Sequence, residues 1–296
     1  MSSSPKTPVI RKNPLYKKAA LIFGILAAGF AMFSITAFYA IPAHFIEGWI
    51  KEKLKERFGI TVADEKFERV FPFGLSVSKV EFFNGSGKPF LYLDELNVKF
   101  KPLSIFTGNL KVGISAVAGG GELNGDFSIR PGGVALNLKG RQIGFNNFPI
   151  LEYSGIKIDG AFNNDLSIEA KNGGCPTGYL DVKAEVLRGG EIRFMGYPLP
   201  VGDLQKAGAA VELGNCEAKV EGVWLEGSDL SARLQGEVTL TAPFSASPID
   251  LSLELIPKEN LIGKEFILSF INAYKRSANF YSVPVKGTIG NPAMVK

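Results

Sequence analysis

From Leu75 onward, apolar and polar residues alternate along most of the chain, as in Leu251, Leu253 and Leu255. Alternate residues of a strand point to the same face of a sheet, so this pattern predicts strands with one apolar and one polar face. Turns rich in glycine and asparagine separate the alternating runs at short intervals. The sequence therefore predicts a mainly β protein of roughly a dozen hairpin-connected, mostly antiparallel strands.

Four of these runs contain the pattern apolar-x-Gly-x-apolar. Each glycine would lie on the apolar face, where a missing side chain lets the sheet bend. The repetition favours a strongly curved or rolled sheet with its apolar face inside, as a groove; the alternative is that each glycine marks a bulge or tight packing. The glycines are Gly125, Gly160, Gly236 and Gly287, and the apolar residues that would line the groove are Phe127, Phe162, Val238 and Ile289.

Two segments have apolar residues four apart instead, which is the spacing of a helix face. Residues 43–58 form an amphipathic helix that ends at Gly59, and we expect its Phe45 and Trp49 to pack on the domain that follows; the alternative is the membrane interface. Residues 258–276 form a helix expected to cap an open end of the sheet, with a movable gate over an apolar groove as the alternative. The spaced residues are Ile46, Ile50 and Leu54 in the first, and Ile262, Phe266, Phe270 and Tyr274 in the second.

Residues 19–41 contain no charged side chain, and the arm 1–18 before them is basic and has no acid. A helix of about 23 residues is about 35 Å long, enough to cross a hydrocarbon core of about 30 Å. This length favours an uncleaved inner-membrane anchor over a cleaved signal peptide. Because basic residues stay in the cytoplasm, residues 60–296 are expected to form a periplasmic β-rich domain. The main apolar residues of the anchor are Leu21, Ile22, Phe23, Ile25, Leu26, Phe30, Phe33, Ile35 and Phe38.

The charge of the chain gives no sign of a nucleic-acid partner. The formal net charge is +4, but five of the 33 basic residues lie in the N-terminal arm. The remaining 28 basic residues nearly balance the 29 acidic ones. The domain after the anchor is thus close to neutral, whereas nucleic-acid binding requires a basic face.

Cys175 and Cys216 are the only cysteines, and the expected orientation places both in an oxidising compartment. A disulfide between them is the natural expectation, with two free buried thiols as the alternative. Each cysteine directly precedes a strand-like run, so a disulfide would tie the starts of two strands together. A metal site is not expected, because two thiols without a nearby histidine supply too few ligands.

The residues for common enzyme chemistry are missing. The single histidine, His44, lies next to the anchor, so the domain has no histidine for a catalytic triad or a metal cluster. The glycine clusters 119–121 and 173–174 are followed by no Gly-Lys-Ser/Thr and lead into no predicted helix, so they are not phosphate loops. We therefore expect a non-enzymatic protein without a cofactor, and nominate no catalytic residue.

The chain resembles the family of type II secretion system protein N. The resemblance rests on the order of a Pro-x-x-Phe-Ile-Glu start after the anchor, glycine-rich strands and a two-cysteine segment. The layout is also similar to AsmA-like and TamB-like proteins, whose coiled sheets form an apolar groove implicated in lipid movement through the envelope. A dozen strands at about 4.8 Å extend only about 60 Å, so a full conduit between two membranes would need partners or copies. The segments that carry the resemblance are 71–75, 174–178, 234–236 and 283–292.

These features lead to two hypotheses of different classes. The first is a non-enzymatic, inner-membrane component of a type II secretion apparatus, whose periplasmic domain docks to other envelope proteins through edge strands or loops. Edge docking predicts unpaired backbone groups at one end of the sheet. The alternative is an AsmA-like carrier whose apolar groove contacts the acyl chains of lipids. For that role, apolar residues must face an open trough rather than fill a dry core.

Overall fold

The computed structural model of the protein divides into two compact units, Met1–Ile46 and Glu47–Lys296. The second unit contains all the strands. The structure describes residues 24–25, 28–30, 32–33, 35–36, 38–185, 187–194, 197–241, 244–261, 265–277 and 279–295.

In the first unit, the described residues between 24 and 40 are helical. Among the residues that the structure describes, no helix is both long enough and apolar enough to cross a membrane. The anchor at 19–41 and the basic arm 1–18 therefore stay predictions. Of the predicted anchor residues, Leu21, Ile22, Phe23 and Leu26 lie outside the described residues, while Ile25, Phe30, Phe33, Ile35 and Phe38 lie in helical pieces.

The predicted amphipathic helix is confirmed as α2, which spans Ala43–Phe58. It ends where Gly59 takes a left-handed backbone with φ 66° and its N–H donates to the carbonyl of Lys55 at 3.0 Å. Glycine favours this conformation, so it ends the helix. The side chains of Phe45 and Trp49 are 66% and 56% exposed, which does not confirm the packing expected of these two rings.

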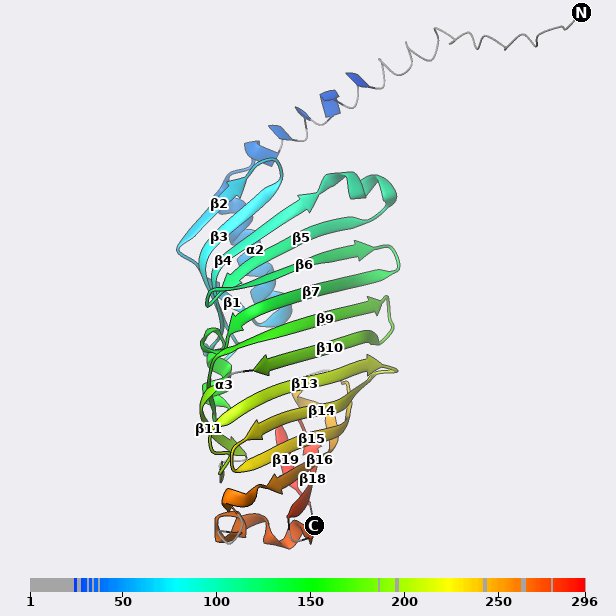
Figure 1. Cartoon of the computed structure of the whole chain (residues 1–296). Helices are drawn as coiled ribbons and strands as arrows, with labels where there is room; N and C mark the ends of the chain where they lie inside the picture. Colours follow the sequence, from blue (N-terminus) through cyan, green and yellow to red (C-terminus); the bar gives the residue numbers. More distant parts are fainter. Residues whose placement is uncertain are drawn as a thin grey trace, which may run out of the picture. The chain divides into compact units, whose positions relative to one another are not determined.

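The prediction of a mainly β protein is confirmed. One antiparallel sheet holds 16 strands, and a second, smaller sheet holds three. In the large sheet the strands follow one another almost in chain order, as the strand labels in Figure 1 show. The estimate of roughly a dozen strands is too low.

The large sheet consists of β1 (Thr61–Ala63), β2 (Lys66–Val70), β3 (Gly74–Phe83), β4 (Pro89–Lys101), β5 (Leu110–Ala118), β6 (Gly121–Arg130), β7 (Gly133–Gly144), β9 (Ala161–Lys171), β10 (Pro176–Glu185), β13 (Leu204–Gly214), β14 (Glu217–Gly227), β15 (Leu230–Thr239), β16 (Pro248–Pro257), β17 (Lys275–Ser277), β18 (Phe280–Thr288) and β19 (Asn291–Met294). The small sheet consists of β8 (Ile156–Asp159), β11 (Arg188–Phe194) and β12 (Tyr197–Leu199). The short helices are η1 (Pro102–Thr107), η2 (Phe145–Asn147), α3 (Pro149–Tyr153), η3 (Phe244–Ala246), η4 (Glu259–Leu261) and η5 (Glu265–Tyr274).

The large sheet has one apolar and one polar face, as the alternation predicts. Phe127 of β6 lies opposite Val112 of β5 and Leu136 of β7, and Leu136 lies opposite Ile168 of β9. Residues directly opposite one another share a face, so these four apolar side chains form one row.

The sheet is not strongly curled, so the expectation of a strongly curved sheet is wrong. The glycines serve close contact between neighbouring strands instead, which is the alternative reading of their pattern. A Cβ on Gly125 would lie 2.0 Å from the carbonyl oxygen of Asn137, and one on Gly236 would lie 2.2 Å from that of Asp250. The space of each missing side chain is therefore filled by the adjacent backbone, and none is left for a sharp bend.

The other two glycines of the pattern lie near strand ends. Gly160 has φ 133° and joins β8 to β9, where the chain passes from the small sheet into the large one. Gly287 has φ 112°, and a Cβ there would lie 2.6 Å from the carbonyl oxygen of Asn291. Both positions have backbone angles that residues with a side chain rarely adopt.

The helix predicted over 258–276 is wrong in type. The chain forms the 3₁₀ helices η4 and η5 and then strand β17, and residues 262–264 lie outside the described residues. Ile271 of η5 is 1% exposed in the same core as Tyr281 and Val283 of β18, so the segment buries apolar surface at this end of the sheet, as expected of a cap. Spacing of four alone does not separate an α-helix from successive tight turns.

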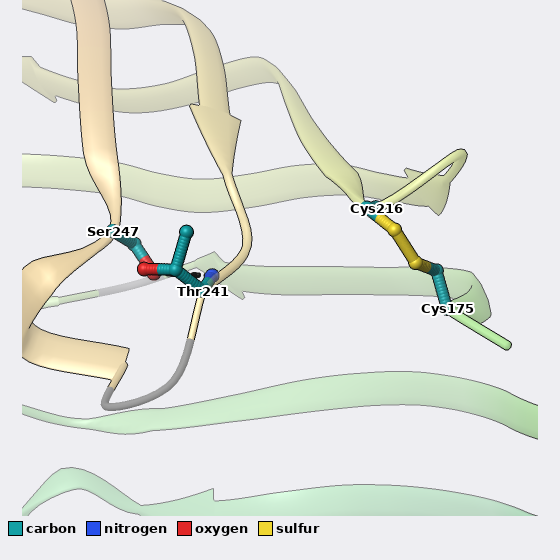
Figure 2. Close-up of a disulfide and its surroundings, with 4 residues drawn as sticks. All are labelled: Cys175, Cys216, Thr241 and Ser247. Atoms are coloured by element: carbon teal, nitrogen blue, oxygen red, sulfur yellow. Dashed lines mark hydrogen bonds between the residues drawn. A yellow bond between two sulfur atoms is a disulfide. The ribbon is translucent and has the colours of Figure 1, made fainter. Parts of the chain in front are cut away.

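The predicted disulfide between Cys175 and Cys216 is confirmed, with the two Cα atoms 4.8 Å apart. Cys175 lies between β9 and β10, and Cys216 lies between β13 and β14. Figure 2 shows the bond joining these two connections. The bond therefore ties together β10 and β13, which are neighbours in the sheet but are separated in the chain by β11 and β12.

Candidate functional site

The apolar face of the large sheet is covered at one end of its strands. There η2, Phe148 just before α3, and the small sheet contribute side chains to one hydrophobic core with the sheet. Phe162 of β9 is 9% exposed, and its ring centroid lies 4.9 Å from that of Phe145 and 5.5 Å from that of Phe148. We call this region the covered end; other buried sheet residues there are Ile143, Ala184, Leu204 and Ala207.

At the other end of β7 and β9, and on the neighbouring β5 and β6, the apolar side chains are only partly covered. Val112, Phe127, Leu136 and Ile168 are half-buried. In the next row outward, three residues that pair across β5, β6 and β7 are 37%, 42% and 39% exposed. This is a continuous apolar surface with access to solvent. We call it the open apolar face, and it consists of Leu110, Val112, Phe127, Ile129, Val134, Leu136 and Ile168.

The four residues predicted to line a groove do not act together. Phe127 lies on the open apolar face, and Ile289 is half-buried against the core. Phe162 and Val238 are buried inside that core. The glycine pattern selects residues on the apolar face, but it does not tell which part of that face is covered.

The other members of the open apolar face carry a signal that the glycine pattern misses. They belong to the same alternating runs as the buried apolar residues of the sheet. The strand register places them side by side, away from the covered end. The register of each predicted hairpin could have been set from its turn, which would have placed these residues opposite one another.

The polar face carries a charged cluster across β7, β9 and β10. Lys139 Nζ lies 2.9 Å from one carboxylate oxygen of Asp165, and the Tyr179 hydroxyl donates to the other at 3.1 Å. The hydrogen bond from Lys139 lowers the pKa of Asp165 and raises the pKa of Lys139 itself. The hydrogen bond to Asp165 raises the pKa of Tyr179. These contacts link three strands on the solvent side.

The edges of the large sheet are largely paired. The outer side of β3 pairs with β2 over Gly74–Ser78 and with β1 over Glu81–Phe83. The outer side of β18 pairs with β17 at one end and with β19 at the other. The strands that cover these edges have only three to five residues each. Short edge strands give a partner strand little backbone to pair with, so the geometry does not favour edge docking.

A cavity of about 570 Å³ lies beside the covered end, between β4, η2, α3 and the strands β8 and β11. Its lining mixes aromatic side chains with both acidic and basic ones, and no pattern in the sequence predicts it. Among the residues that the structure describes, no three His, Cys, Asp or Glu side chains gather as metal ligands. The residues that line the cavity include Tyr92, Phe145, Phe148, Glu152, Lys157 and Arg188.

Neither the protein-family models nor the curated proteins nor the solved structures compared with this chain give a match.

Proposed function

We propose that the chain is a non-enzymatic component of a type II secretion apparatus in the bacterial envelope, and that it works through the open apolar face of its sheet. The observation that carries the proposal is the row of half-buried apolar residues next to a row exposed by 37–42%. A contiguous exposed apolar surface of this kind is typical of a contact site.

Two further observations support a role in the envelope. The Cys175–Cys216 disulfide is typical of proteins in an oxidising compartment, such as the periplasm. The uncharged run 19–41 is long enough to anchor the chain in the inner membrane. The paired sheet edges favour a face over an edge as the contact surface.

The test is complementation of a strain that lacks the gene. Folded exoproteins are expected to accumulate in the periplasm of the deletion strain, and the wild-type chain should restore their secretion. Phe127→Asp puts a charge on the open apolar face and should fail to restore it. Asn124→Asp, on the polar face of the same strand, is the matched control and should succeed. Normal secretion in the deletion strain would sink the proposal.

A lipid carrier is the second candidate, and the same apolar face favours it. Apolar burial is worth about 25 cal/mol per Å², so an acyl chain lying along the row from Val112 to Ile168 would be held by that surface alone. Native mass spectrometry with lipid extraction on the detergent-purified full chain tests this role. Phospholipid that co-purifies with the wild type and with Asn124→Asp, but not with Phe127→Asp, would favour the carrier. Secretion subunits recovered in place of lipid would favour the apparatus component.

A further inference from the structure

The turns at the open end of the first strands carry large apolar side chains that project into solvent. Phe71, between β2 and β3, is 72% exposed, and Leu103, in η1 after β4, is 77% exposed. The two turns lie at the same end of the sheet, because Gly74 at the start of β3 pairs with Lys99 near the end of β4.

The exposed row of the open apolar face starts beside these turns. Leu110 is the first residue of β5 after η1; it pairs with Ile129, which pairs with Val134. Large exposed apolar side chains thus follow one margin of the sheet over five successive strands and their turns. We call this set the apolar rim; its members are Phe71, Leu103, Leu110, Ile129 and Val134.

Hydrogen bonds close the loop that presents Leu103. The Ser104 hydroxyl donates to the carbonyl of Lys101 at 2.6 Å and accepts from the N–H of Lys111 at 3.0 Å. The N–H of Asn109 donates to the carbonyl of Ser104 at 3.1 Å. Because both ends of the loop are tied to Ser104, Leu103 is held on the outside of a closed turn.

Lysines lie next to the rim on the opposite, polar face of the sheet. Lys101 and Lys111 lie opposite one another on β4 and β5. Like charges in this position destabilise a sheet, so an anion between them would relieve the repulsion. Lys101 also contacts Asp126 at 2.5 Å, whereas Lys99 and Lys111 have no ion-pair partner among the described residues.

The polar face is hollowed next to these lysines. A hollow of about 520 Å³ lies between Lys99, Lys101 and Lys139, over Gly113, which has no side chain to fill it. Asp126 also lines the hollow, and Lys101 and Lys139 are ion-paired with Asp126 and Asp165. Lys99, with Lys111 on the neighbouring strand, is therefore the group left to bind the phosphate of a lipid headgroup.

We infer that the apolar rim and the lysines behind it form a membrane-docking edge. The apolar side chains enter the interfacial layer of a bilayer, and Lys99 and Lys111 contact anionic headgroups. Surfaces that combine apolar side chains with a basic flank bind membranes in this way. The rim shares Leu110, Ile129 and Val134 with the open apolar face. The inference is nevertheless separate from the proposed secretion role, because its test reports on Leu103, which lies outside that face.

The experiment places the full chain in nanodiscs and reports on position 103. Leu103→Trp is made in a Trp49→Phe/Trp224→Phe background, so that it is the only tryptophan. Phosphatidylcholine with brominated acyl chains, with or without phosphatidylglycerol, is supplied either in the disc itself or as separate vesicles. Ile150→Trp in the same background is the matched control, since Ile150 is 45% exposed but lies in α3 at the covered end.

We expect a blue shift and several-fold stronger quenching of the Leu103→Trp emission than of the control, in one of the two arrangements, when phosphatidylglycerol is present. Lys99→Glu/Lys111→Glu should remove most of this quenching; Lys99→Gln/Lys111→Gln serves if the first pair does not fold. Phe127→Asp should leave it unchanged.

Emission equal to that of the control in both arrangements would overturn the inference. So would a blue shift that follows protein concentration instead of lipid, because it would identify a second copy as the occupant. Equal quenching by neutral lipid would overturn the role of the lysines.

Discussion

The covered end and the open apolar face share strands β7 and β9 of one sheet, have the same alternation and differ in burial. Phe162 is 9% exposed, whereas Ile129 is 42% exposed. The difference comes from the connections. At the covered end, long connections fold back as η2, α3 and the small sheet; at the open end, the turn 131–132 between Ile129 and Val134 is too short to cover them. Whether an apolar strand face becomes core or contact surface is thus decided by what joins the strands.

The largest effect is expected from removing the disulfide. At the covered end, β10 and β13 are joined in the chain through β11 and β12 of the small sheet, whereas at the open end the Cys175–Cys216 bond links their neighbourhoods covalently. In the chain-entropy model, a cross-link between residues 41 apart contributes about 4 kcal/mol to the free energy of unfolding. Cys175→Ser/Cys216→Ser should therefore lower the midpoint of urea unfolding, and amide exchange should increase near Gly178 more than near Ala184. Equal exchange at both ends would show that the bond does not act locally.

The next effect compares one phenylalanine from each region. Phe162→Ala removes a buried ring packed on Phe145 and Phe148 and should reduce the free energy of unfolding by about 3–4 kcal/mol. Phe127→Ala removes a half-buried ring and should reduce it by only about 1–2 kcal/mol. Denaturant titration of both variants measures the difference. A comparable loss for the two would mean that the open apolar face is packed as tightly as the core.

A smaller loss is expected at Gly236, which lies away from both regions. Its φ is 139°, and an added Cβ would lie 2.2 Å from the carbonyl oxygen of Asp250. Gly236→Ala should reduce the free energy of unfolding by about 2–3 kcal/mol. Gly132→Ala is the control, since a Cβ there meets nothing within 4 Å, and it should change stability by less than about 1 kcal/mol. If the two variants are equally stable, close strand contact is not the reason for the glycine.

The smallest effect concerns the polar face. The hydrogen bond from Lys139 lowers the pKa of Asp165, so its stabilisation is present above the ordinary pKa of an aspartate and is lost as the pH falls through the lowered value. Lys139→Gln should raise the pKa of Asp165 toward its ordinary value, as measured by carboxyl NMR titration. Because the group is exposed, the change in stability should be close to the limit of measurement. An unchanged pKa in this variant would contradict the assigned cause.

Local chemistry in the sequence is enough to predict several features of the fold. Spacing of four next to Gly59 gives α2 with its observed bounds, and alternation gives the two faces of the sheet. The disulfide follows from the presence of only two cysteines, Cys175 and Cys216. Each of these predictions depends on neighbouring residues or on a single possible pairing.

Features that depend on non-local geometry were not predicted correctly. The role of Gly125 and Gly236 depends on how closely the next strand approaches, which no local pattern encodes. The segment after Lys258 forms 3₁₀ turns because tertiary packing, as at Ile271, overrides helical spacing. The division of the apolar face into covered and open parts depends on the path of the connections, so the predicted groove combined Phe127 with buried residues.

The connections that build the small sheet leave and rejoin the large sheet at paired positions. Gly144 pairs with Ala161 across the first connection, and Glu185 pairs with Lys206 across the second. A shorter turn could bridge either pair without disturbing the register, so both connections have the character of insertions that evolution can lengthen, exchange or lose. One extra residue inside β6, by contrast, would move its following side chains to the opposite face. Variation in length among descendants of this chain should therefore collect along a single margin of the sheet.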